Sequence, residues 1–389
     1  MLLSLLLQRW RQTGSDALLD MVNMTLEHMA RGGMYDQLGG GFHRYSVDAR
    51  WLVPHFENML YDNALLAGCY LDAWQTTGKP LYGRVVRETL DYVLRDMTAA
   101  EGGFYCAEDA DSEGVEGKFY LWTPEEIAAV LGAERAKIFC HVYDVTATGN
   151  FEGRNILHLA NPIALAAKML DRDADELEAE LAEDRRLLLA ARSQRVRPLR
   201  DDKVLTHWNG LMIEALTRAG KVLNEPRYSQ AAARAAEFLL RSLRDNRGRL
   251  MHCWRNGSAR HSAYLDDYAS LANALVTLGQ HQPEGPWLDE AIRLTDRIVQ
   301  QFHDPRLGGF FFTAEDHEPL IVRKKDVIDN SLPSSNGLTV TVLLRLAELG
   351  RGDQYRRLAE DTLRSSMGIV QQIPLSAGQL LMALQRCLG

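Results

Sequence analysis

The segment from residue 39 to residue 63 holds a dense group of side chains that can do chemistry. It reads GGGFHRYSVD and then, from residue 51, WLVPHFENMLYDN. Glycines, aromatic rings, two histidines, two arginines and several carboxyl groups occur together in one loop-rich stretch. An ordinary core loop does not need so many titratable and planar groups, whereas a pocket for a polar, ring-shaped ligand does. The segment therefore predicts a binding site for such a ligand.

His55 and Glu57 are the most direct acid–base candidates, because they are separated by a single residue. In an extended backbone both side chains would point the same way, as a base and the carboxylate that orients it must. The alternative is a histidine held in a structural hydrogen bond. We expect the preceding His43, Arg44 and Tyr45 to contact a substrate, and an arginine there can bind a carboxylate or phosphate group, or pair with an acidic loop.

An acidic run, EDADSEG, follows at residues 108–114. It lacks the calcium-loop pattern, with no glycine at the sharp turn and no terminal bidentate glutamate in place. We therefore expect no metal site. Asp109 and Asp111 remain candidates for catalytic carboxylates, and the alternative is a hydrogen-bonded loop that caps neighbouring helices.

Other polar residues stand where helices are expected to begin. Capping a helix is the simpler role for such residues, and catalysis or substrate binding is the alternative. Among them Asp202, His207 and Asp267 are catalytic candidates, with His252 as a further histidine. The binding candidates at these positions are Asp62, Lys203, Asn209, Ser335 and Asn336.

Four aromatic side chains are candidates for stacking on a sugar ring. A pyranose presents C–H groups that pack on aromatic faces, while its hydroxyl groups need carboxylate and amide partners. Core packing is the alternative role for each ring. The four are Trp51, Trp122, Trp208 and Tyr268.

A helical hairpin recurs along the chain. Copies begin near residues 62, 208, 265 and 335, and each has a turn, a second helix opened by a tyrosine or tryptophan, and often a glycine-rich end such as GGF. Apolar residues recur at three-to-four spacing in these helices, as in residues 228–243. Adjacent copies are spaced by roughly 60 residues, which suits a long hairpin with a loop.

These hairpins predict an all-α, (α/α)6 toroid with short β-hairpins in its loops. In an antiparallel hairpin the start of the first helix and the end of the second lie at the same end, so the chemical motifs fall on one rim. A closed ring would bring them together, whereas an open superhelix would spread them out. We expect residues 1–389 to form one toroid, with an insertion at about 123–200 that begins in a helix capped by Thr123.

Bulk properties exclude several functions. The net charge of −8 argues against non-specific nucleic-acid binding, which needs a basic face. The five cysteines show no Cys-x-x-Cys spacing, so neither a zinc site nor a disulfide framework is expected. No apolar run is long enough to span a membrane, and the expected setting is cytoplasmic.

The motifs named above, together with DDKVLTHWNG at residues 201–210 and YLDDYA at 264–269, resemble the C-terminal region of the spermatogenesis-associated, thioredoxin-domain-containing proteins, the YyaL-like family. The resemblance extends over essentially the whole chain. It implies a six-hairpin glycosidase-type toroid, similar in architecture to N-acylglucosamine 2-epimerases and unsaturated glucuronyl hydrolases.

Two departures from that family affect what can be expected. Its members usually carry an N-terminal thioredoxin-like domain with a cysteine motif, which this chain lacks, so no redox function or cofactor is expected here. In addition, His207 stands where a small residue is commoner before Trp-Asn-Gly, which can change the pocket locally.

The resulting hypothesis is a carbohydrate-active enzyme that acts on a small sugar or sugar derivative. We favour an epimerase or isomerase that uses His55 with His207 or His252 as acid and base. The first alternative is a glycoside hydrolase with two carboxylates across the scissile bond, and the second is a non-catalytic module for sugar sensing or protein interaction. The hydrolase carboxylates would come from Asp109, Asp111, Asp202 and Asp267.

Overall fold

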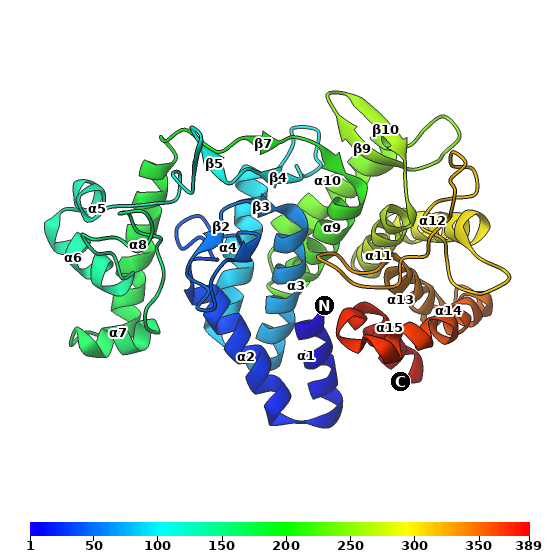
Figure 1. The fold of residues 1–389 in the computed structure, drawn as a ribbon, viewed down its shortest axis with the longest axis horizontal. Coiled ribbons are helices and arrows are strands. Elements are labelled where there is room, and N and C mark those ends of the chain that lie inside the picture. The colour runs from blue at the N-terminus through cyan, green and yellow to red at the C-terminus, as the bar shows by residue number, and fades with distance from the viewer.

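Two concentric layers of helices make up most of the structure, a computed structural model that covers residues 1–389 (Figure 1). The inner helices are α1 (Leu2–Thr13), α3 (Leu60–Thr77), α9 (Thr206–Val222), α11 (Leu265–His281), α13 (Ser335–Glu348) and α15 (Gly378–Leu388). The outer helices are α2 (Asp16–Arg31), α4 (Pro80–Asp96), α10 (Pro226–Ser242), α12 (Trp287–Phe302) and α14 (Asp353–Gln372), and a short 3-10 helix, Pro374–Ser376, precedes α15. Successive inner helices contact one another, and α1 closes the ring by contacting both α3 and α15. The predicted (α/α)6 toroid is confirmed.

The burial pattern explains which helices lie inside. In α11 almost every residue from Leu265 to Leu278 is buried, because this helix is covered on all sides. The outer helix α12 instead buries residues at three-to-four spacing, among them Ala291, Leu294 and Ile298, and exposes its polar face. The inner layer therefore forms the core of the ring, and the outer layer shields it.

The repeated glycine-rich loops are attached to the next inner helix by an asparagine. The side chain of Asn209 accepts the backbone N–H of Phe104 at 2.8 Å and donates to the carbonyl oxygen of Phe104 at 2.9 Å. This paired contact fixes the end of one hairpin on the start of the next. The same contact joins Asn63 to Phe42 and Asn336 to Phe310.

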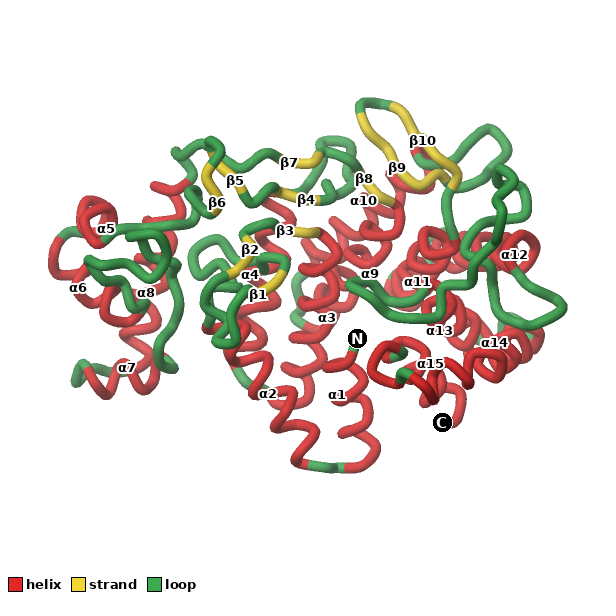
Figure 2. Tube along the Cα trace, in the orientation of Figure 1, coloured by secondary structure: helices red, strands yellow, loops and turns green.

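Short antiparallel strands lie in the loops at the start of the inner helices (Figure 2). β3 and β8 run directly into α3 and α9. The strands pair as β1–β2, β5–β6, β3–β4–β7 and β8–β9–β10. Their bounds are Tyr45–Ser46, Pro54–His55, Asn58–Met59, Ala107–Glu108, Asp111–Ser112, Val115–Glu116, Arg200–Asp201, Val204–Leu205, Met251–Arg255 and Ser258–Ser262, from β1 to β10.

Residues 123–200 stand between α4 and α9 and pack around a small hydrophobic cluster of their own, seen at the left of Figure 1. The helices are α5 (Pro124–Leu131), α6 (Ala133–Val142), α7 (Ile163–Met169) and α8 (Ala174–Arg192). The predicted cap is present, because the side chain of Thr123 accepts the backbone N–H of Glu126 and the Glu126 carboxylate accepts that of Thr123.

Two further expectations concern the cysteines and the membrane. All five cysteines are free thiols. Burial raises the pKa of Cys69 to about 11, so this thiol stays protonated. None of the helices combines the length and the apolar character that a membrane crossing requires.

Candidate functional site at the rim of the ring

The first turns of α3, α9 and α11 bring titratable and aromatic side chains to one end of the ring, which we call the rim. Tyr61 of α3 and Trp208 of α9 meet edge to face, with ring centroids 4.7 Å apart. Asp62 follows Tyr61 in the chain, and His207 precedes Trp208. The two aromatic residues in this contact therefore have a carboxyl group and an imidazole as their respective neighbours in the chain.

His207 is oriented by the start of α11. Its Nδ1 atom lies 3.1 Å from Oδ2 of Asp266, and its backbone N–H donates to Asp267 at 3.0 Å. Burial acts to raise the pKa of Asp266, but the neighbouring His207 lowers it overall, so this carboxylate stays ionised. A carboxylate next to Nδ1 fixes the proton there and leaves the lone pair on Nε2. That Nε2 atom is buried and has no hydrogen-bond partner, so His207 presents a free acceptor.

Asp267 connects three elements of the rim and is 0% exposed. It accepts the backbone N–H of His207 and that of Tyr264, the latter at 2.9 Å, and its Oδ2 lies 2.8 Å from Nδ1 of His252. Burial acts to lower the pKa of His252, but its hydrogen bond to Asp267 raises it overall. Asp267 has no surface for a substrate, so its predicted catalytic role does not fit its position. It supports α9, α11 and β9.

Asp62 has a strongly raised pKa. Burial raises it to about 7, with a contribution from Glu57 and against the effect of Arg44. Its Oδ2 atom is buried and has no hydrogen-bond partner. At neutral pH this carboxyl group is divided between its two protonation states, as a general acid or base needs. The sequence predicts Asp62 only as a binding residue, because the burial that raises its pKa is a property of the fold.

The β1–β2 hairpin places a second polar group beside α3. Nη1 of Arg44 donates to Glu57 at 2.9 Å. His55 lies near Glu57, with Nε2 3.7 Å from its carboxylate, but the shorter contact joins Nδ1 of His55 to Glu116 at 2.8 Å. Tyr45 stacks on the imidazole of His55, with centroids 5.2 Å apart. The predicted neighbours His55 and Glu57 do meet, while Glu116 was not indicated by the sequence.

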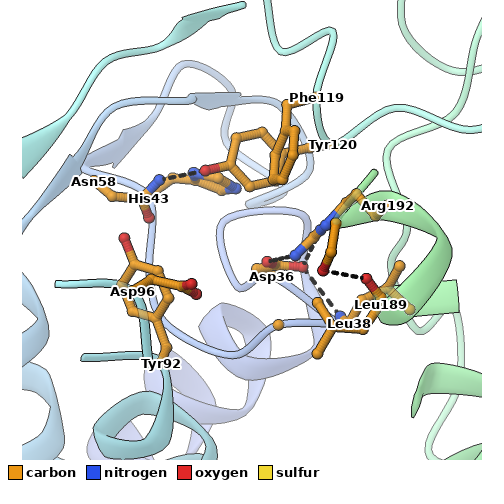
Figure 3. A network of polar contacts seen from close by, with 12 residues as sticks. Asp36, Leu38, His43, Asn58, Tyr92, Asp96, Phe119, Tyr120, Leu189 and Arg192 are labelled. Carbon is orange, nitrogen blue, oxygen red and sulfur yellow. Dashed lines mark hydrogen bonds and ion pairs between the residues drawn. The ribbon is translucent and has the colours of Figure 1, made fainter. Parts of the chain in front are cut away.

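His43 lies beneath this hairpin and is 2% exposed. Its Nδ1 atom lies 3.0 Å from the carbonyl oxygen of Phe56, and its ring packs edge to face on Tyr120 at 4.6 Å. Burial lowers the pKa of His43 to about 4, so the ring is neutral. Figure 3 shows His43 beside Asn58 and Tyr120 within a packed network. The prediction that His43 contacts a substrate therefore does not hold, because its polar atoms are enclosed.

Two of the four predicted stacking rings have no free face. Trp122 is 2% exposed in a hydrophobic cluster that it shares with Leu38 and residues of the segment 123–200, and the guanidinium of Arg195 lies 4.0 Å from its ring centroid. Tyr268 is buried against Phe302, and its hydroxyl accepts the backbone N–H of Leu250 at 2.9 Å. Both rings are core residues, and of the predicted platforms Trp208 is the one that lies at the centre of the rim.

Three predicted binding residues serve the backbone instead. In Asn209 and in Asn336, both the amide oxygen and the amide nitrogen make the loop contacts described above. Ser335 is fully buried, and its hydroxyl donates to the carbonyl oxygen of Asp326 at 3.4 Å. These contacts are structural, but they are not the helix capping that the sequence left open, because neither α9 nor α13 has a side-chain hydrogen bond at its N-cap.

The remaining predicted residues lie in loops around the rim. Asp109 and Asp111 are exposed in the segment of β4 and β5. Asp202 is paired with Arg255, and Lys203 with its near neighbour Asp201. Trp51 is partly buried against the main core. No group of three or more histidine, cysteine or acidic side chains has a geometry suited to a metal ion.

A cavity inside the ring is lined by none of the predicted site residues. It measures about 750 Å³ and lies between the inner helices. Glu214, Arg218 and Arg345 are among its lining residues. They belong to no motif, and the signal available was a pair of opposite charges four residues apart on helix α9, Glu214 and Arg218.

Comparison with known proteins gives sequence relatives of greater length. Spermatogenesis-associated protein 20 of Homo sapiens is 37% identical over 373 residues, covering 87% of this chain and 47% of that protein. The protein of the same name from Rattus norvegicus is 33% identical over 411 residues, covering 97% of this chain and 52% of that protein. The chain thus spans about half the length of the curated relatives it matches. No family model matches it.

Solved structures share the fold at low sequence identity. Cellobiose 2-epimerase from Bacillus thermoamylovorans matches with a TM-score of 0.56 and 10% identity, over 90% of this chain and 72% of that one. The GH76 alpha-mannanase of Bacteroides thetaiotaomicron matches with a TM-score of 0.58 and 10% identity, over 99% of this chain and 84% of that one. At this identity the likeness concerns the fold alone.

The sequence relatives and the shared architecture agree with the resemblance seen in the motifs. The chain is a homologue of spermatogenesis-associated protein 20, and it has the (α/α)6 fold of six-hairpin glycosidases and sugar 2-epimerases.

Proposed function

We propose that the rim is the active site of a sugar epimerase or isomerase that acts on a small sugar by acid–base chemistry. One observation carries the proposal: Asp62 and His207 each have a buried polar atom without a partner, and they flank the contact between Tyr61 and Trp208. An unsatisfied buried polar atom is costly in a folded protein. A substrate that supplies the missing partners would remove that cost.

The reaction needs a base and an acid on opposite faces of one carbon atom. Nε2 of His207 takes the proton from the carbon next to the carbonyl group of an open-chain sugar, and the C–H electron pair forms an enediolate. The protonated fraction of Asp62 then gives a proton to the other face, and the carbonyl group re-forms with the configuration inverted. Asp62 is suited to this step because its pKa of about 7 provides both protonation states at neutral pH.

The neighbouring residues fit recognition of a sugar. Trp208 is half-buried and offers an aromatic face for the C–H side of a pyranose. Arg44, Glu57 and His252 are partly exposed near the starts of α3 and α11 and can bind hydroxyl groups. His55 remains a candidate for a second acid–base role through its contact with Glu116.

Isotope exchange in D₂O tests the proposal directly. The protein is incubated with a panel of aldoses, ketoses and reducing disaccharides, and products are analysed by NMR. Deuterium at the carbon next to the carbonyl, together with the epimeric or isomeric sugar, is the expected result. His207→Gln and Asp62→Asn should each lower this exchange about 10²–10⁴-fold, while His141→Gln, an exposed histidine of α6, should not.

The same panel separates the other two functions. New reducing ends without deuterium incorporation would identify a hydrolase and overturn the epimerase proposal. Binding without turnover would identify a non-catalytic module, in which Trp208→Ala should weaken binding more than His207→Gln. Exchange that persists in both His207→Gln and Asp62→Asn would remove this pair from the mechanism.

A further inference from the structure

The cavity inside the ring is not lined by Asp62, His207 or Trp208 of the rim. Its charged lining residues, Asp72 of α3, Arg218 of α9 and Arg345 of α13, belong to later turns of the inner helices. Near the starts of α1, α13 and α15 it is lined by Ser4, Pro333 and Gln379. At the level of the second turns its wall is apolar, with Ala64, Leu65, Leu211 and Leu338. These side chains lie between the first-turn residues of the rim and the charged part of the cavity. Its volume of about 750 Å³ is in the range of small-molecule sites in proteins.

A glycine in the middle of α3 keeps this cavity open. Gly68 lies in the interior of the helix, where glycine is less favourable than alanine. A Cβ atom added there would meet only Nη1 of Arg218, at 3.7 Å, and the backbone of Gly68 is not in the left-handed region. Neither close packing nor backbone geometry therefore requires glycine at this position. Its effect is to leave space in front of the Arg218 guanidinium.

Arg218 is held in place with part of its guanidinium free. Its Nη2 atom donates to Asp72 at 2.7 Å, and Asp72 also pairs with Arg11 at 3.5 Å. Nη1, the atom that faces Gly68, makes no hydrogen bond within the chain. A guanidinium fixed on one side by a carboxylate has its other N–H groups pre-oriented for an acceptor, and a carboxylate or phosphate matches them best.

Arg345 forms a second fixed cation in the cavity. It donates to the side chain of Asn273 at 2.6 Å, to Thr277 at 2.9 Å and to Gln280 at 2.8 Å. Burial lowers the pKa of Arg345, and although Glu214 opposes this, Arg386 and Arg218 lower it further. The arginines thus repel one another across the cavity despite their acidic partners, and an anion between them would relieve that repulsion.

Two unpartnered atoms complete the lining. Nδ1 of His281 and Oε1 of Gln385 belong to residues that line the cavity, and both atoms are buried without a hydrogen-bond partner. Hydroxyl groups can act as donor or acceptor and would satisfy both atoms. The glycine, the free guanidinium edge and the two unpartnered atoms all point to an occupant with one anionic group and several hydroxyls.

We propose that this cavity is a second ligand site, independent of the rim, for a small hydroxylated organic anion whose carboxylate or phosphate binds Arg218 beside Gly68. The reaction proposed for the rim is not needed for this binding. The site is thus testable whether or not the rim is catalytic.

Calorimetric titration of the intact chain tests the site with four probes: D-gluconate, D-glucose 6-phosphate, inorganic phosphate and D-glucose. We expect D-gluconate or D-glucose 6-phosphate to bind, and D-glucose to bind at least about ten-fold more weakly, because it lacks the anionic group. The first two probes distinguish a carboxylate from a phosphate ligand, and inorganic phosphate shows whether the hydroxyl groups contribute.

Two variants locate the binding. Gly68→Leu should fill the space and abolish it, and Arg218→Gln should weaken it about ten-fold or more. Gly368→Leu is the matched control, because Gly368 also lies inside a helix, α14, with nothing near its added Cβ atom. His207→Gln should leave binding unchanged, which separates this site from the rim. Gly68→Ala is the milder variant to use if Gly68→Leu does not fold, since its small side chain meets nothing closer than 3.7 Å.

Three results would overturn the proposal. The first is that neither hydroxylated anion binds, and the second is that D-glucose binds as tightly as they do and loses its binding in Gly68→Leu. The third is that Gly68→Leu, folded as judged by its thermal transition, binds the anion as the parent protein does.

Discussion

Nδ1 of His207 lies 3.1 Å from a carboxylate oxygen of Asp266, and this contact joins the first turns of α9 and α11. It sets which nitrogen of the imidazole carries the proton. An asparagine at position 266 can offer an N–H to Nδ1 instead, which would move the proton to Nε2 and remove the free lone pair there. The function of His207 at the rim therefore depends on a residue of another helix.

We predict that Asp266→Asn lowers sugar turnover about 10²–10⁴-fold while the fold is retained. The exchange assay in D₂O measures the rate, and ¹⁵N NMR of the imidazole reports the tautomer. Asp289→Asn, an exposed aspartate in the first turn of α12, is the matched control and should have no effect. Unchanged turnover with a changed tautomer would contradict the role given to His207.

A second prediction concerns Asp62 and pH. Its pKa is about 7 in the folded protein against 3.8 normally, so the folded state holds this proton more tightly than the unfolded state. Well below pH 3.8 the Asp62 carboxyl group is protonated in both the folded and the unfolded state, so it does not lower the free energy of unfolding. As the pH rises from about 4 to 7 the unfolded state ionises more readily, and the folded protein loses up to about 4 kcal/mol of stability.

Asp62→Asn removes this titration. The free energy of unfolding, measured by urea denaturation, should therefore increase in the variant relative to the parent protein as the pH rises from 4 to 7. The difference should be constant below pH 3.5. A difference that did not vary with pH would show that the carboxyl group is not buried in solution.

The third prediction concerns the junction between residues 123–200 and the ring. Arg192 of α8 donates to Asp36 through two nitrogens, one at 2.8 Å, and both side chains are buried (Figure 3). Arg192→Met should destabilise the protein by about 3–5 kcal/mol, because it leaves the Asp36 carboxylate buried and unpaired. Thermal and urea unfolding measure the loss.

The double variant Asp36→Asn with Arg192→Met should recover part of that stability, since no uncompensated charge remains. Arg186→Met, whose side chain is exposed on the same helix, is the control and should change stability by less than about 1 kcal/mol. Equal effects of Arg192→Met and Arg186→Met would contradict the importance of the buried pair.

The fourth prediction separates a structural from a binding role for Asn209. Asn209→Ala leaves the backbone N–H and carbonyl oxygen of Phe104 buried without partners, so it should cost about 2–4 kcal/mol of stability. KM for any sugar substrate should not change in the folded fraction. Asn246→Ala, at an exposed loop asparagine, is the control. A rise in KM without loss of stability would show instead that Asn209 binds the substrate.

The repeated hairpins could be read from the sequence, because amphipathic spacing and turn residues are local signals. The cap at Thr123 and the helix up to Arg192 were likewise predictable, since each depends on residues within a few positions of one another. The asparagines at the start of the inner helices were visible as a repeat. Their partners were not, because the backbone of Phe104 reaches Asn209 only through the fold.

The site was less predictable for the same physical reason. Residue type does not tell which face of an aromatic ring is covered, so Trp122 and Trp208 looked alike in the sequence. The raised pKa of Asp62 arises from burial by distant segments, and the free Nε2 of His207 arises from its contact with Asp266. Arg218 and Arg345 face the cavity from the later turns of α9 and α13, where no motif marks them.

The closing contact of the ring joins residues at opposite ends of the chain, since Nε2 of Gln8 in α1 lies 3.4 Å from the carbonyl oxygen of Met382 in α15. During synthesis the α1 side of the ring therefore stays uncovered until α15 has left the ribosome. Contacts between residues so far apart in the sequence form slowly, because the entropy of closing a long loop is lost before the contacts stabilise the structure. We expect nascent chains that lack α15 to expose the apolar flank of α1 and to bind chaperones or aggregate. The step that completes the toroid is thus also the step at which its biogenesis is most vulnerable.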